Sequence, residues 1–389
     1  MTPEDQQLTA PVVLIDATAV PHDRGGVGRY LDGFVPHITG SLFIACQERD
    51  AAHYRSLAPS ATVLPQPARI ASVPLRFVWE QLMLPSVARR VGASVIHSPH
   101  YTLPVMTRRA RVVTFHDATF FSDPSVHTPI KRIFFSAWIR LSARLADAVL
   151  VPSRATASEL ERFVSRPRGY DVAHHGVDQG IFYPLEVAGR EAAANRLGLS
   201  DMRWIAFLGT IEPRKNLPQL VRAYRELVRS WSSSWGAVPV LALAGGQGWE
   251  QKLQQEVDLV QAPGVIRQLG FLPLERLRDL LGGAEVVCYP SLGEGFGLPV
   301  LEAMACGAPV LTTRRLALPE VGGDAVAYCD TDAGSIESGL RALLKSASER
   351  LRLATLGHDR SLLFTWAASA RVHENVFTRV AGHNPGISK

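Results

Sequence analysis

The 389-residue sequence has few of the features that mark secreted, metal-binding or membrane-spanning proteins. Its four cysteines stand apart, without a C-x-x-C pair or a metal-type spacing of cysteine and histidine, so we expect reduced, buried thiols. No apolar run approaches the ~18 residues that are needed to cross a bilayer. The N-terminus, MTPEDQQLTAP, lacks a charged-then-apolar signal. We therefore expect a cytoplasmic protein that is soluble or at most lies on a membrane surface.

Basic residues outnumber acidic ones but form no long block. The formal net charge is +5 and the isoelectric point is about 9.2. This balance favours anionic partners such as nucleotides or phospholipid surfaces. No nucleic-acid-binding motif accompanies the charge, so we predict no nucleic-acid partner. Internal repeats are also absent, and the length with 47% hydrophobic residues fits two or three globular domains.

The stretch 289–307 carries most of the functional information. An apolar run over 286–289 predicts a buried strand, and Pro299 suits the first turn of a helix that Gly307 would end. Three glycines lie between the two elements, namely Gly293, Gly295 and Gly297. Because glycine has no Cβ, the loop backbone can approach a ligand closely. The N–H groups at the start of the helix would favour an anionic ligand.

Two carboxylates bracket this loop, Glu294 within it and Glu302 in the first turns of the predicted helix. A phosphate would repel both, so we expect them to accept hydrogen bonds from hydroxyl groups. A diphosphate flanked by two polyols, as in a sugar nucleotide, fits this arrangement. The alternative is a plain turn with solvated glutamates, which is the usual explanation of an isolated G-x-G. The coincidence of glycines, glutamates and proline favours the ligand site.

The segment EGFGLPVLEAMACGAPV resembles the family 4 retaining glycosyltransferases, or glycosyl transferases group 1, which share a Glu, seven residues, Glu motif. The resemblance implies the α/β GT-B fold, in which two Rossmann-like domains with parallel sheets face a central cleft. It implies an acceptor-binding domain over 1–183, a nucleotide-sugar donor-binding domain over 184–366, and a C-terminal helix over 367–389 that crosses back to the first domain. The glycines and proline of 182–200 indicate a linker.

Two further segments match phosphate-binding elements of that family. RGGVGRY begins at Arg24, and the resemblance places Gly26 and Gly28 over the donor phosphates. GTIEPRKN contains Arg214 and Lys215, two cations that would neutralise a diphosphate. Taken alone, the first segment could be a glycine turn that only packs a helix on a sheet, and the second a solvated basic turn.

Histidines follow two predicted parallel strands of the first half, at the strand ends where open α/β sheets bind ligands. The resemblance implies that His116 contacts the transferred sugar. It also places His97, His100 and Asp117 near the acceptor. A lone histidine is more often structural, and that alternative stays open for His97 and His100.

The resemblance implies a complete set of site residues. The implied catalytic residues are His116, Glu294, Arg214 and Lys215. The implied donor-binding residues are Gly26, Gly28, Gly209, Arg214, Lys215, Glu294, Gly295, Phe296, Gly297, Leu298 and Glu302. Leu269, Gly270 and Leu272 would border the nucleotide base, although apolar residues there equally suit a core. Glu302 would bind the ribose and Glu294 only the donor sugar, so we expect Glu294→Ala to abolish transfer without disturbing the fold.

The sequence also sets expectations for the substrates. No D-x-D pair follows a predicted strand, so we expect neither a metal nor another bound cofactor. EPRKN together with HSP and LP resembles bacterial mannosyl- and related transferases, which makes GDP-mannose the first expected donor and a UDP-sugar the second. The expected acceptor is a glycan or a polyprenyl- or other lipid-linked molecule. The alternatives are a sugar-nucleotide epimerase of the same fold and a catalytically inactive sugar-nucleotide-binding subunit.

The amphipathic segment 73–91 combines apolar positions with three arginines. A surface helix packed on the sheet is the first interpretation. Relatives with lipid-linked acceptors touch membranes through basic helices of this domain. Peripheral contact with an anionic membrane, at the inner face of the plasma membrane, is therefore the second interpretation.

Overall fold

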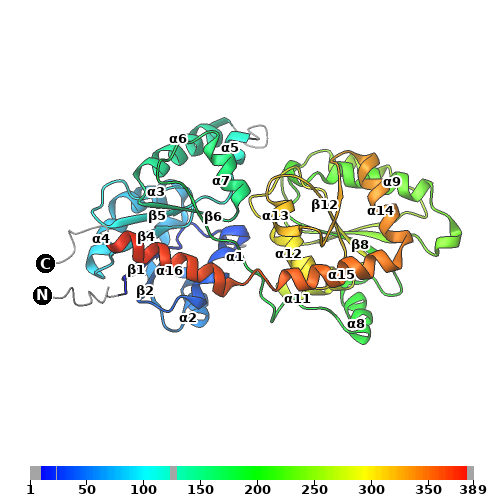
Figure 1. Cartoon of the computed structure of the whole chain (residues 1–389), viewed down its shortest axis with the longest axis horizontal. Coiled ribbons are helices and arrows are strands. Elements are labelled where there is room, and N and C mark those ends of the chain that lie inside the picture. The colour runs from blue at the N-terminus through cyan, green and yellow to red at the C-terminus, as the bar shows by residue number, and fades with distance from the viewer. Residues whose placement is uncertain (1–9, 23, 123–128, 383–389) are drawn as a thin grey trace, which may run out of the picture. The chain divides into compact units, whose positions relative to one another are not determined.

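The computed structural model describes residues 10–22, 24–122 and 129–382, and the chain forms two compact units (Figure 1). Unit 1 comprises residues 1–176 and 366–389, and unit 2 comprises residues 177–365. Residues 1–9, most of the N-terminal segment that lacks a targeting signal, lie outside the described residues. None of the helices in the described ranges is long and apolar enough to cross a membrane.

Unit 1 is built on a parallel sheet with the strand order β3-β2-β1-β4-β5-β6-β7. Its strands are β1 (Val13–Asp16), β2 (Leu42–Gln47), β3 (Thr62–Gln66), β4 (Val95–Ser98), β5 (Ala110–Thr114), β6 (Ala148–Val151) and β7 (Asp171–Val172). The central strands β1, β4 and β6 are buried along their whole length. Strands buried on both faces carry near-continuous apolar runs, which is why the sequence shows runs here and no alternation.

The helices of unit 1 cover this sheet. They are α1 (Gly25–Phe34), α2 (Ala51–Leu57), α3 (Val73–Leu82), α4 (Leu84–Arg90), α5 (Thr119–Ser122), α6 (Pro129–Leu145), α7 (Arg154–Glu161) and α16 (Trp366–Gly382). The amphipathic segment 73–91 is two helices, because Pro85 occupies the first turn of α4 and cannot continue α3. The last helix, α16, packs against α1 and the middle of the sheet in unit 1 (Figure 1).

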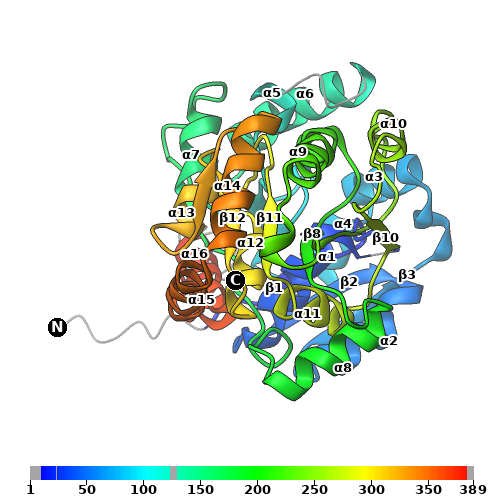
Figure 2. The same ribbon diagram turned by 90° about the vertical axis from the view of Figure 1, so that its right-hand side faces the viewer.

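Unit 2 repeats the same architecture with the strand order β10-β9-β8-β11-β12-β13, again all parallel. Its strands are β8 (Trp204–Leu208), β9 (Val240–Ala244), β10 (Ile266–Gly270), β11 (Val286–Tyr289), β12 (Val310–Thr313) and β13 (Ala327–Cys329). Its helices are α8 (Val187–Leu197), α9 (Leu217–Arg229), α10 (Leu253–Asp258), α11 (Leu274–Gly282), α12 (Leu298–Ala305), α13 (Leu318–Gly322), α14 (Ala333–Lys345) and α15 (Ala347–Ser361). Figure 2 shows α9 and α14 on one face of this sheet and α8 and α11 on the other.

The predicted linker at 182–200 is wrong. Most of that stretch is helix α8, which packs on α11 and contributes Leu197 to the core of unit 2. Arg196 donates two hydrogen bonds of 2.7 Å to the carboxylate of Asp279 on α11. Gly198 has a φ of 68° and ends the helix, so it serves as a helix C-cap and not as a flexible joint.

The boundary between the units lies before Val177, earlier than the expected residue 184. Val177 and Phe182 are buried in the core of unit 2, which explains the shift. The amide of Val177 donates a 3.1 Å hydrogen bond to the carbonyl of Phe364 at the other end of the unit.

The four cysteines are free and buried, as expected: Cys46, Cys288, Cys306 and Cys329. Burial raises the pKa of each thiol above its ordinary value. Protonated, buried thiols are chemically inert, so these residues serve as small apolar side chains.

Candidate functional site

The strand, glycine loop and helix predicted at 286–307 are present. Strand β11 ends at Tyr289 and α12 begins at Leu298. Gly297 precedes α12 with a φ of 100°, and a Cβ on it would lie 2.8 Å from Leu318. Only glycine suits this position, because a side chain would be strained and would also clash.

Glu294 lies at the centre of a buried polar cluster beneath this loop. Its side chain is 6% exposed, and one carboxylate oxygen accepts hydrogen bonds from Lys215 Nζ (2.7 Å), Tyr289 Oη (2.9 Å) and Ser291 Oγ (2.6 Å). The other oxygen accepts a hydrogen bond of 2.6 Å from Arg214. The predicted pair of cations and the predicted carboxylate are therefore brought together.

The basic turn is anchored to the glycine loop through its backbone as well. Arg214 and Lys215 lie in a 3₁₀ turn, Pro213–Lys215, that follows β8. The amide of Leu292 donates to the carbonyl of Arg214 at 2.8 Å, and the Arg214 guanidinium donates to the carbonyl of Gly293 at 2.8 Å. Arg214 also donates to Glu212 at 2.8 Å. These hydrogen bonds join the basic turn to the glycine loop. Tyr289 and Ser291 complete the cluster through their hydrogen bonds to Glu294, and no sequence motif indicated these two residues.

Burial and charge oppose each other in this cluster. Burial would raise the pKa of Glu294, but the charges of Arg214 and Lys215 and the hydrogen bonds from Lys215 and Ser291 lower it to about 2. Burial lowers the pKa of Lys215, the charge of Arg214 lowers it further, and Glu294 and Glu212 counteract the shift. The two cations of the cluster are thus balanced by two carboxylates, Glu294 and Glu212.

The structure gives Glu294 protein partners that the sequence did not predict, and its contact with a sugar stays a prediction. Its carboxylate is the partner of both Arg214 and Lys215. Removing it would leave buried cations without their main counter-charge, which is strongly destabilising. Glu294→Ala is consequently expected to affect the stability of unit 2 as well as activity.

Five other predicted residues of unit 2 are those near the cluster or in α12, Gly209 and Glu302, and those predicted to border the nucleotide base, Leu269, Gly270 and Leu272. Glu302 is buried in α12, and Gly209 lies beside the cluster, where an added Cβ would be 3.6 Å from Lys215. Leu269 and Leu272 are partly buried and pack against the core, while Gly270 has a φ of 65°. Core packing alone explains the two leucines, so their contact with a nucleotide base stays a prediction.

The glycines of the first predicted phosphate loop differ from each other. A Cβ added to Gly28 would lie 2.7 Å from the Cβ of Arg24, so packing alone requires glycine there. A Cβ added to Gly26 would meet nothing within 4 Å. Gly26 therefore has no packing reason to be glycine, which suits a backbone that a ligand approaches.

The histidines of unit 1 occupy two different environments. His97, on β4, is fully buried and hydrogen-bonds Thr114 at 2.8 Å, and Thr114 also contacts the Tyr30 hydroxyl at 3.0 Å. That hydroxyl lies 2.5 Å from Nε2 of His373 on α16. His97 thus belongs to a buried network that attaches α16 to the sheet. No local pattern indicates the distant partners Tyr30 and His373.

His116 and His100 lie closer to the strand ends. His116 Nε2 lies 2.8 Å from the carbonyl of Pro99, and burial lowers the pKa of the ring, so it is neutral. Asp117 accepts two hydrogen bonds from Thr119, at 3.0 Å from its amide and 2.7 Å from its hydroxyl, which fixes the turn into α5. These two hydrogen bonds explain the presence of Asp117 without a ligand. His100 lines a small cavity in unit 1.

The expectation that no D-x-D pair follows a strand is wrong, because Asp330 and Asp332 directly follow β13. Asp332 accepts a 3.0 Å hydrogen bond from the amide of Ser335 and so caps α14. No group of three or more His, Cys, Asp and Glu side chains within residues 10–22, 24–122 and 129–382 could hold a metal ion. The charged groups that converge on Glu294 are Arg214 and Lys215, with Glu212 beside Arg214. Preorganised donors of this kind can stabilise a negative charge that develops during a reaction.

Comparison with known proteins identifies the family. Residues 190–359 match the family described as Glycosyl transferases group 1, and residues 24–180 match Glycosyltransferase Family 4. The O-antigen chain mannosyltransferase B of Escherichia coli is 32% identical over 274 residues, which cover 70% of this chain and 71% of that protein. The MMP alpha-(1->4)-mannosyltransferase of Mycolicibacterium hassiacum is 32% identical over 251 residues, 62% of this chain and 57% of that protein.

Structural comparison agrees with the sequence matches. The sucrose-phosphate synthase of Thermosynechococcus elongatus superimposes with a TM-score of 0.75 at 19% identity and covers 96% of this chain and 99% of that one. At this level of identity the likeness concerns the fold alone. The family matches cover both units, and the Escherichia coli mannosyltransferase aligns over 70% of this chain. We conclude that this chain is a glycosyltransferase of family 4 with the GT-B fold.

Proposed function

We propose that this protein is a retaining hexosyltransferase that transfers mannose from GDP-mannose to a glycan or lipid-linked acceptor. The observation that carries the proposal is the cluster of Arg214, Lys215 and Glu294 beneath the glycine loop. Two relatives bear the name mannosyltransferase, which supports mannose as the first donor sugar. A UDP-sugar is the second candidate.

In this proposal the diphosphate of the donor takes over the cations that Glu294 holds in the described structure. Arg214 offers a planar fork to two phosphate oxygens and Lys215 a compact charge. The N-terminus of α12 adds backbone N–H groups. Glu294, released from part of its ion pairing, then accepts hydrogen bonds from the sugar hydroxyls, and Glu302 binds the ribose. Together these groups stabilise the departing diphosphate.

His116 in unit 1 keeps its predicted role of contacting the transferred sugar. Its neutral ring, set by burial, donates from Nε2 to the carbonyl of Pro99, so its Nδ1 can accept one hydrogen bond from a sugar hydroxyl without adding a charge. The described chain shows no activated nucleophile beside the Glu294 cluster, and the cluster itself is occupied by ion pairs. We therefore propose front-face, substrate-assisted transfer with retention of the anomeric configuration.

Ligand binding and product analysis test this function together. We expect GDP to raise the melting temperature more than UDP, ADP or dTDP does, with and without magnesium. At ~100 times its dissociation constant, a ligand adds ~2.7 kcal/mol of stability. A glycosylated acceptor with retained anomeric configuration by NMR would support the transferase. Conversion of the sugar nucleotide without acceptor would indicate the epimerase, and binding without turnover the inactive subunit.

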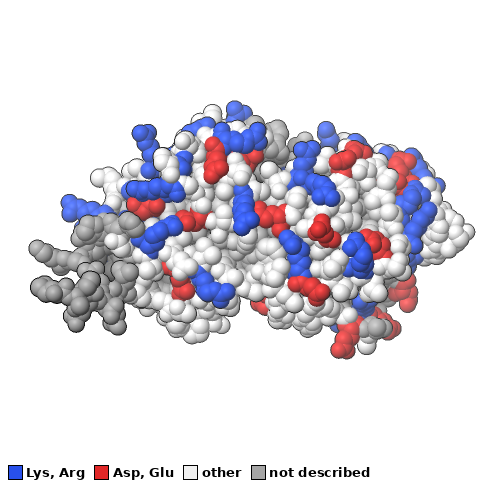
Figure 3. Space-filling model, viewed as in Figure 1, with Lys and Arg blue, Asp and Glu red and all other residues white. Residues whose placement is uncertain are grey.

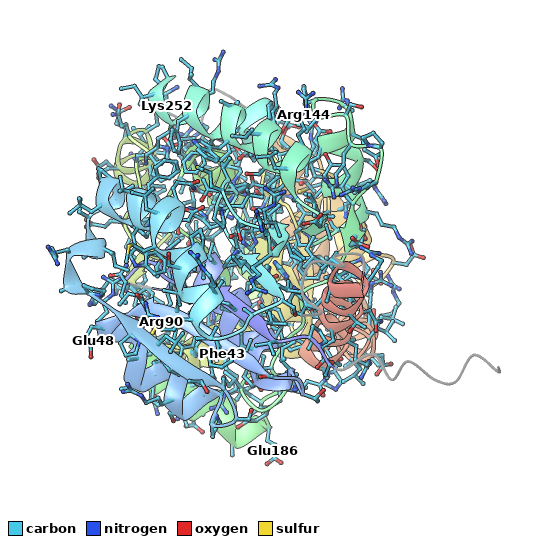
Figure 4. All side chains as sticks on the ribbon, turned by 90° about the vertical axis from the view of Figure 1, so that its left-hand side faces the viewer. Phe43, Glu48, Arg90, Arg144, Glu186 and Lys252 are labelled. Atoms are coloured by element: carbon cyan, nitrogen blue, oxygen red, sulfur yellow. The ribbon has the colours of Figure 1, made fainter. Side chains whose placement is uncertain are left out.

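A surface of unit 1 supports the proposed lipid-linked acceptor. Exposed apolar side chains gather on α3 and α6, which contact each other through Phe77 and Trp138, whose ring centroids lie 5.0 Å apart. The apolar residues of this α3–α6 surface are Val73, Leu75, Val78, Leu82, Ile130 and Ile133. Arg90 of α4 and Arg144 of α6 are exposed on unit 1, and Figure 4 shows them well apart from each other. On the face of the molecule in Figure 3, basic and acidic side chains are interspersed.

We expect the α3–α6 surface to contact anionic membranes. Leu82→Glu combined with Ile133→Glu should lower binding to phosphatidylglycerol vesicles by more than ~10-fold, because two apolar side chains at ~1.5–3 kcal/mol each are lost from the contact. Co-sedimentation measures this binding. The control variant, Leu351→Glu with Leu363→Glu, changes side chains of unit 2 that are 69% and 72% exposed and should bind normally. Equal binding by both variants would contradict the proposal.

A further inference from the structure

A small cavity in unit 1 lies where β1 and β4 end, and of the residues predicted near the acceptor only His100 is among those that line it. Its volume is about 60 Å³, and its walls include Asp16, Arg76, Glu80 and His100. Strands β1 and β4 are neighbours, and β1 pairs with β2 on its other side. The chain therefore changes direction across the sheet at this point, and open parallel sheets bind ligands at such a switch point.

Two buried carboxylates, Asp16 and Glu80, line the cavity. Asp16 is 5% exposed and accepts hydrogen bonds from the amide and the hydroxyl of Thr18, at 3.0 and 2.6 Å. Glu80 is 6% exposed and accepts a 2.7 Å hydrogen bond from Thr102. Within the described ranges neither carboxylate forms an ion pair. Burying such groups costs free energy, so a role beyond folding is indicated.

A cation and a histidine also line this cavity. The guanidinium of the half-buried Arg76 forms no hydrogen bond or ion pair with a residue that the structure describes, although its charge acts on Asp16 and Glu80. Nδ1 of His100 is buried without a hydrogen-bond partner in the same part of the chain. A buried polar atom without a partner at a cavity indicates that a polar ligand can complete its hydrogen bonds.

The protonation of the carboxylates defines the chemistry of the ligand. Burial and the neighbouring Asp16 raise the pKa of Glu80 to about 8, and burial raises that of Asp16. At neutral pH the pair therefore holds a proton, so it offers both a hydrogen-bond donor and acceptors. An anionic ligand would be repelled by Asp16, whereas hydroxyl groups can both give and take hydrogen bonds.

Aromatic side chains form the apolar part of the wall. Phe77 and Phe134 line the cavity with their ring centroids 5.6 Å apart, and Phe135 lies beside Phe134. Apolar faces with a few convergent polar groups are typical of pockets for small ligands. A volume of about 60 Å³ has room for roughly four water-sized groups, which corresponds to the hydroxyl-bearing side of one sugar ring.

We propose that this pocket binds a neutral sugar ring of the glycosyl acceptor and that Asp16, Arg76 and Glu80 determine which sugar is accepted. The inference rests on the proposed function, since the acceptor is the substrate that still needs a site in unit 1. Carboxylates and the guanidinium bind the hydroxyl groups, and the phenylalanine rings contact the C–H face. The apolar wall continues into the α3–α6 surface, because α3 and α6 supply both Phe77 and Phe134.

Saturation-transfer NMR on the full chain tests this pocket directly, with methyl α-mannoside and methyl α-glucoside as sugar probes and inorganic phosphate as the anion. We expect the wild type to bind one of the glycosides. Glu80→Gln should retain this binding within ~3-fold, because glutamine resembles the protonated acid. Glu80→Ala and Arg76→Met should weaken it ~10-fold or more, since each lost hydrogen bond to a ligand is worth ~1.4 kcal/mol. A thermal melt checks that Arg76→Met folds, because the substitution also removes a positive charge that acts on Asp16 and Glu80.

The pH dependence adds a result that a merely structural role would not produce. The charged or titratable groups facing Glu80 are Asp16 on β1, Arg76 on α3 and His100 after β4. Binding to the wild type should fall as the pH rises through about 8 and Glu80 ionises, and binding to Glu80→Gln should stay flat.

Three outcomes would overturn the proposal. The first is glycoside binding that survives both Glu80→Ala and Arg76→Met, the second is binding of phosphate in place of a glycoside, and the third is that neither glycoside binds. Nucleoside diphosphates should stabilise all variants equally, because Arg76 and Glu80 are not among the predicted donor-binding residues. If nucleoside diphosphates do not stabilise the wild type while it still binds the glycoside, the result would contradict the proposed function but not the proposed sugar pocket.

Discussion

Glu294→Ala is expected to lower transfer by at least ~100-fold and the free energy of unfolding by ~3–5 kcal/mol. The loss of activity follows from the proposed hydrogen bonds to the donor sugar. The loss of stability follows from the structure, because the carboxylate is the counter-charge of Lys215 and Arg214 at 2.7 and 2.6 Å. Removing one member of a buried ion pair leaves the remaining charge without compensation.

Activity assays and urea unfolding separate these two effects, with Glu256→Ala as the matched control. Glu256 is 8% exposed and accepts hydrogen bonds from Arg222 and Arg225, so it resembles Glu294 in burial and partners. Its replacement should also lower stability but should preserve turnover in the folded fraction. Unchanged turnover in folded Glu294→Ala would contradict the proposed donor role. Unchanged stability would contradict the importance of the ion pairs.

Acid should reproduce part of this effect in the wild type. The pKa of Glu294 in the folded state, about 2, lies below its ordinary value of 4.5. A lowered carboxyl pKa contributes stability that is present above the unfolded-state value and is lost as the pH falls toward 2. The wild type should therefore lose its advantage over Glu294→Gln between about pH 4.5 and pH 2. Circular dichroism melts of both proteins measure the difference, and parallel curves would argue against the ionised carboxylate.

Lys215→Met is expected to weaken binding of the nucleoside diphosphate by ~10- to 100-fold. The substitution removes a compact positive charge, and a charge-assisted hydrogen bond to phosphate is worth ~1.5–3 kcal/mol. Methionine retains most of the apolar stem. Glu294 would keep Arg214, Tyr289 and Ser291 as hydrogen-bond partners, so stability should fall less than in Glu294→Ala.

Isothermal titration calorimetry with GDP and UDP measures this affinity, and Arg203→Met provides the control. Arg203 also donates two hydrogen bonds to a carboxylate of unit 2, Glu285, at 2.8 and 2.7 Å. It lies outside the proposed donor site, so its loss should leave nucleotide affinity unchanged. If Lys215→Met binds GDP as tightly as Arg203→Met does, Lys215 has no phosphate role.

Local sequence patterns were sufficient for the central elements. The apolar run at 286–289, the glycine loop and Pro299 predicted a strand, a loop and a helix, and all three are present. This works because strands buried on both faces and helix starts at proline have strong local signatures. The same reasoning failed at 182–200, where Pro184 and two glycines indicated a linker and the structure has α8. Tertiary packing of α8 on α11 overrides the weak local preference there.

Sequence by itself thus determined the family and the parallel α/β architecture, and it indicated Glu294, Arg214 and Lys215, because these depend on motifs of adjacent residues. Only the tertiary structure decided how those residues pair. It showed that Glu294 holds the two cations, that His97 belongs to a network with Tyr30 and His373, and that Asp16 and Glu80 share one cavity. The physical reason is distance along the chain. Such contacts join residues tens to hundreds of positions apart, and their energies come from burial and charge, which no local pattern records.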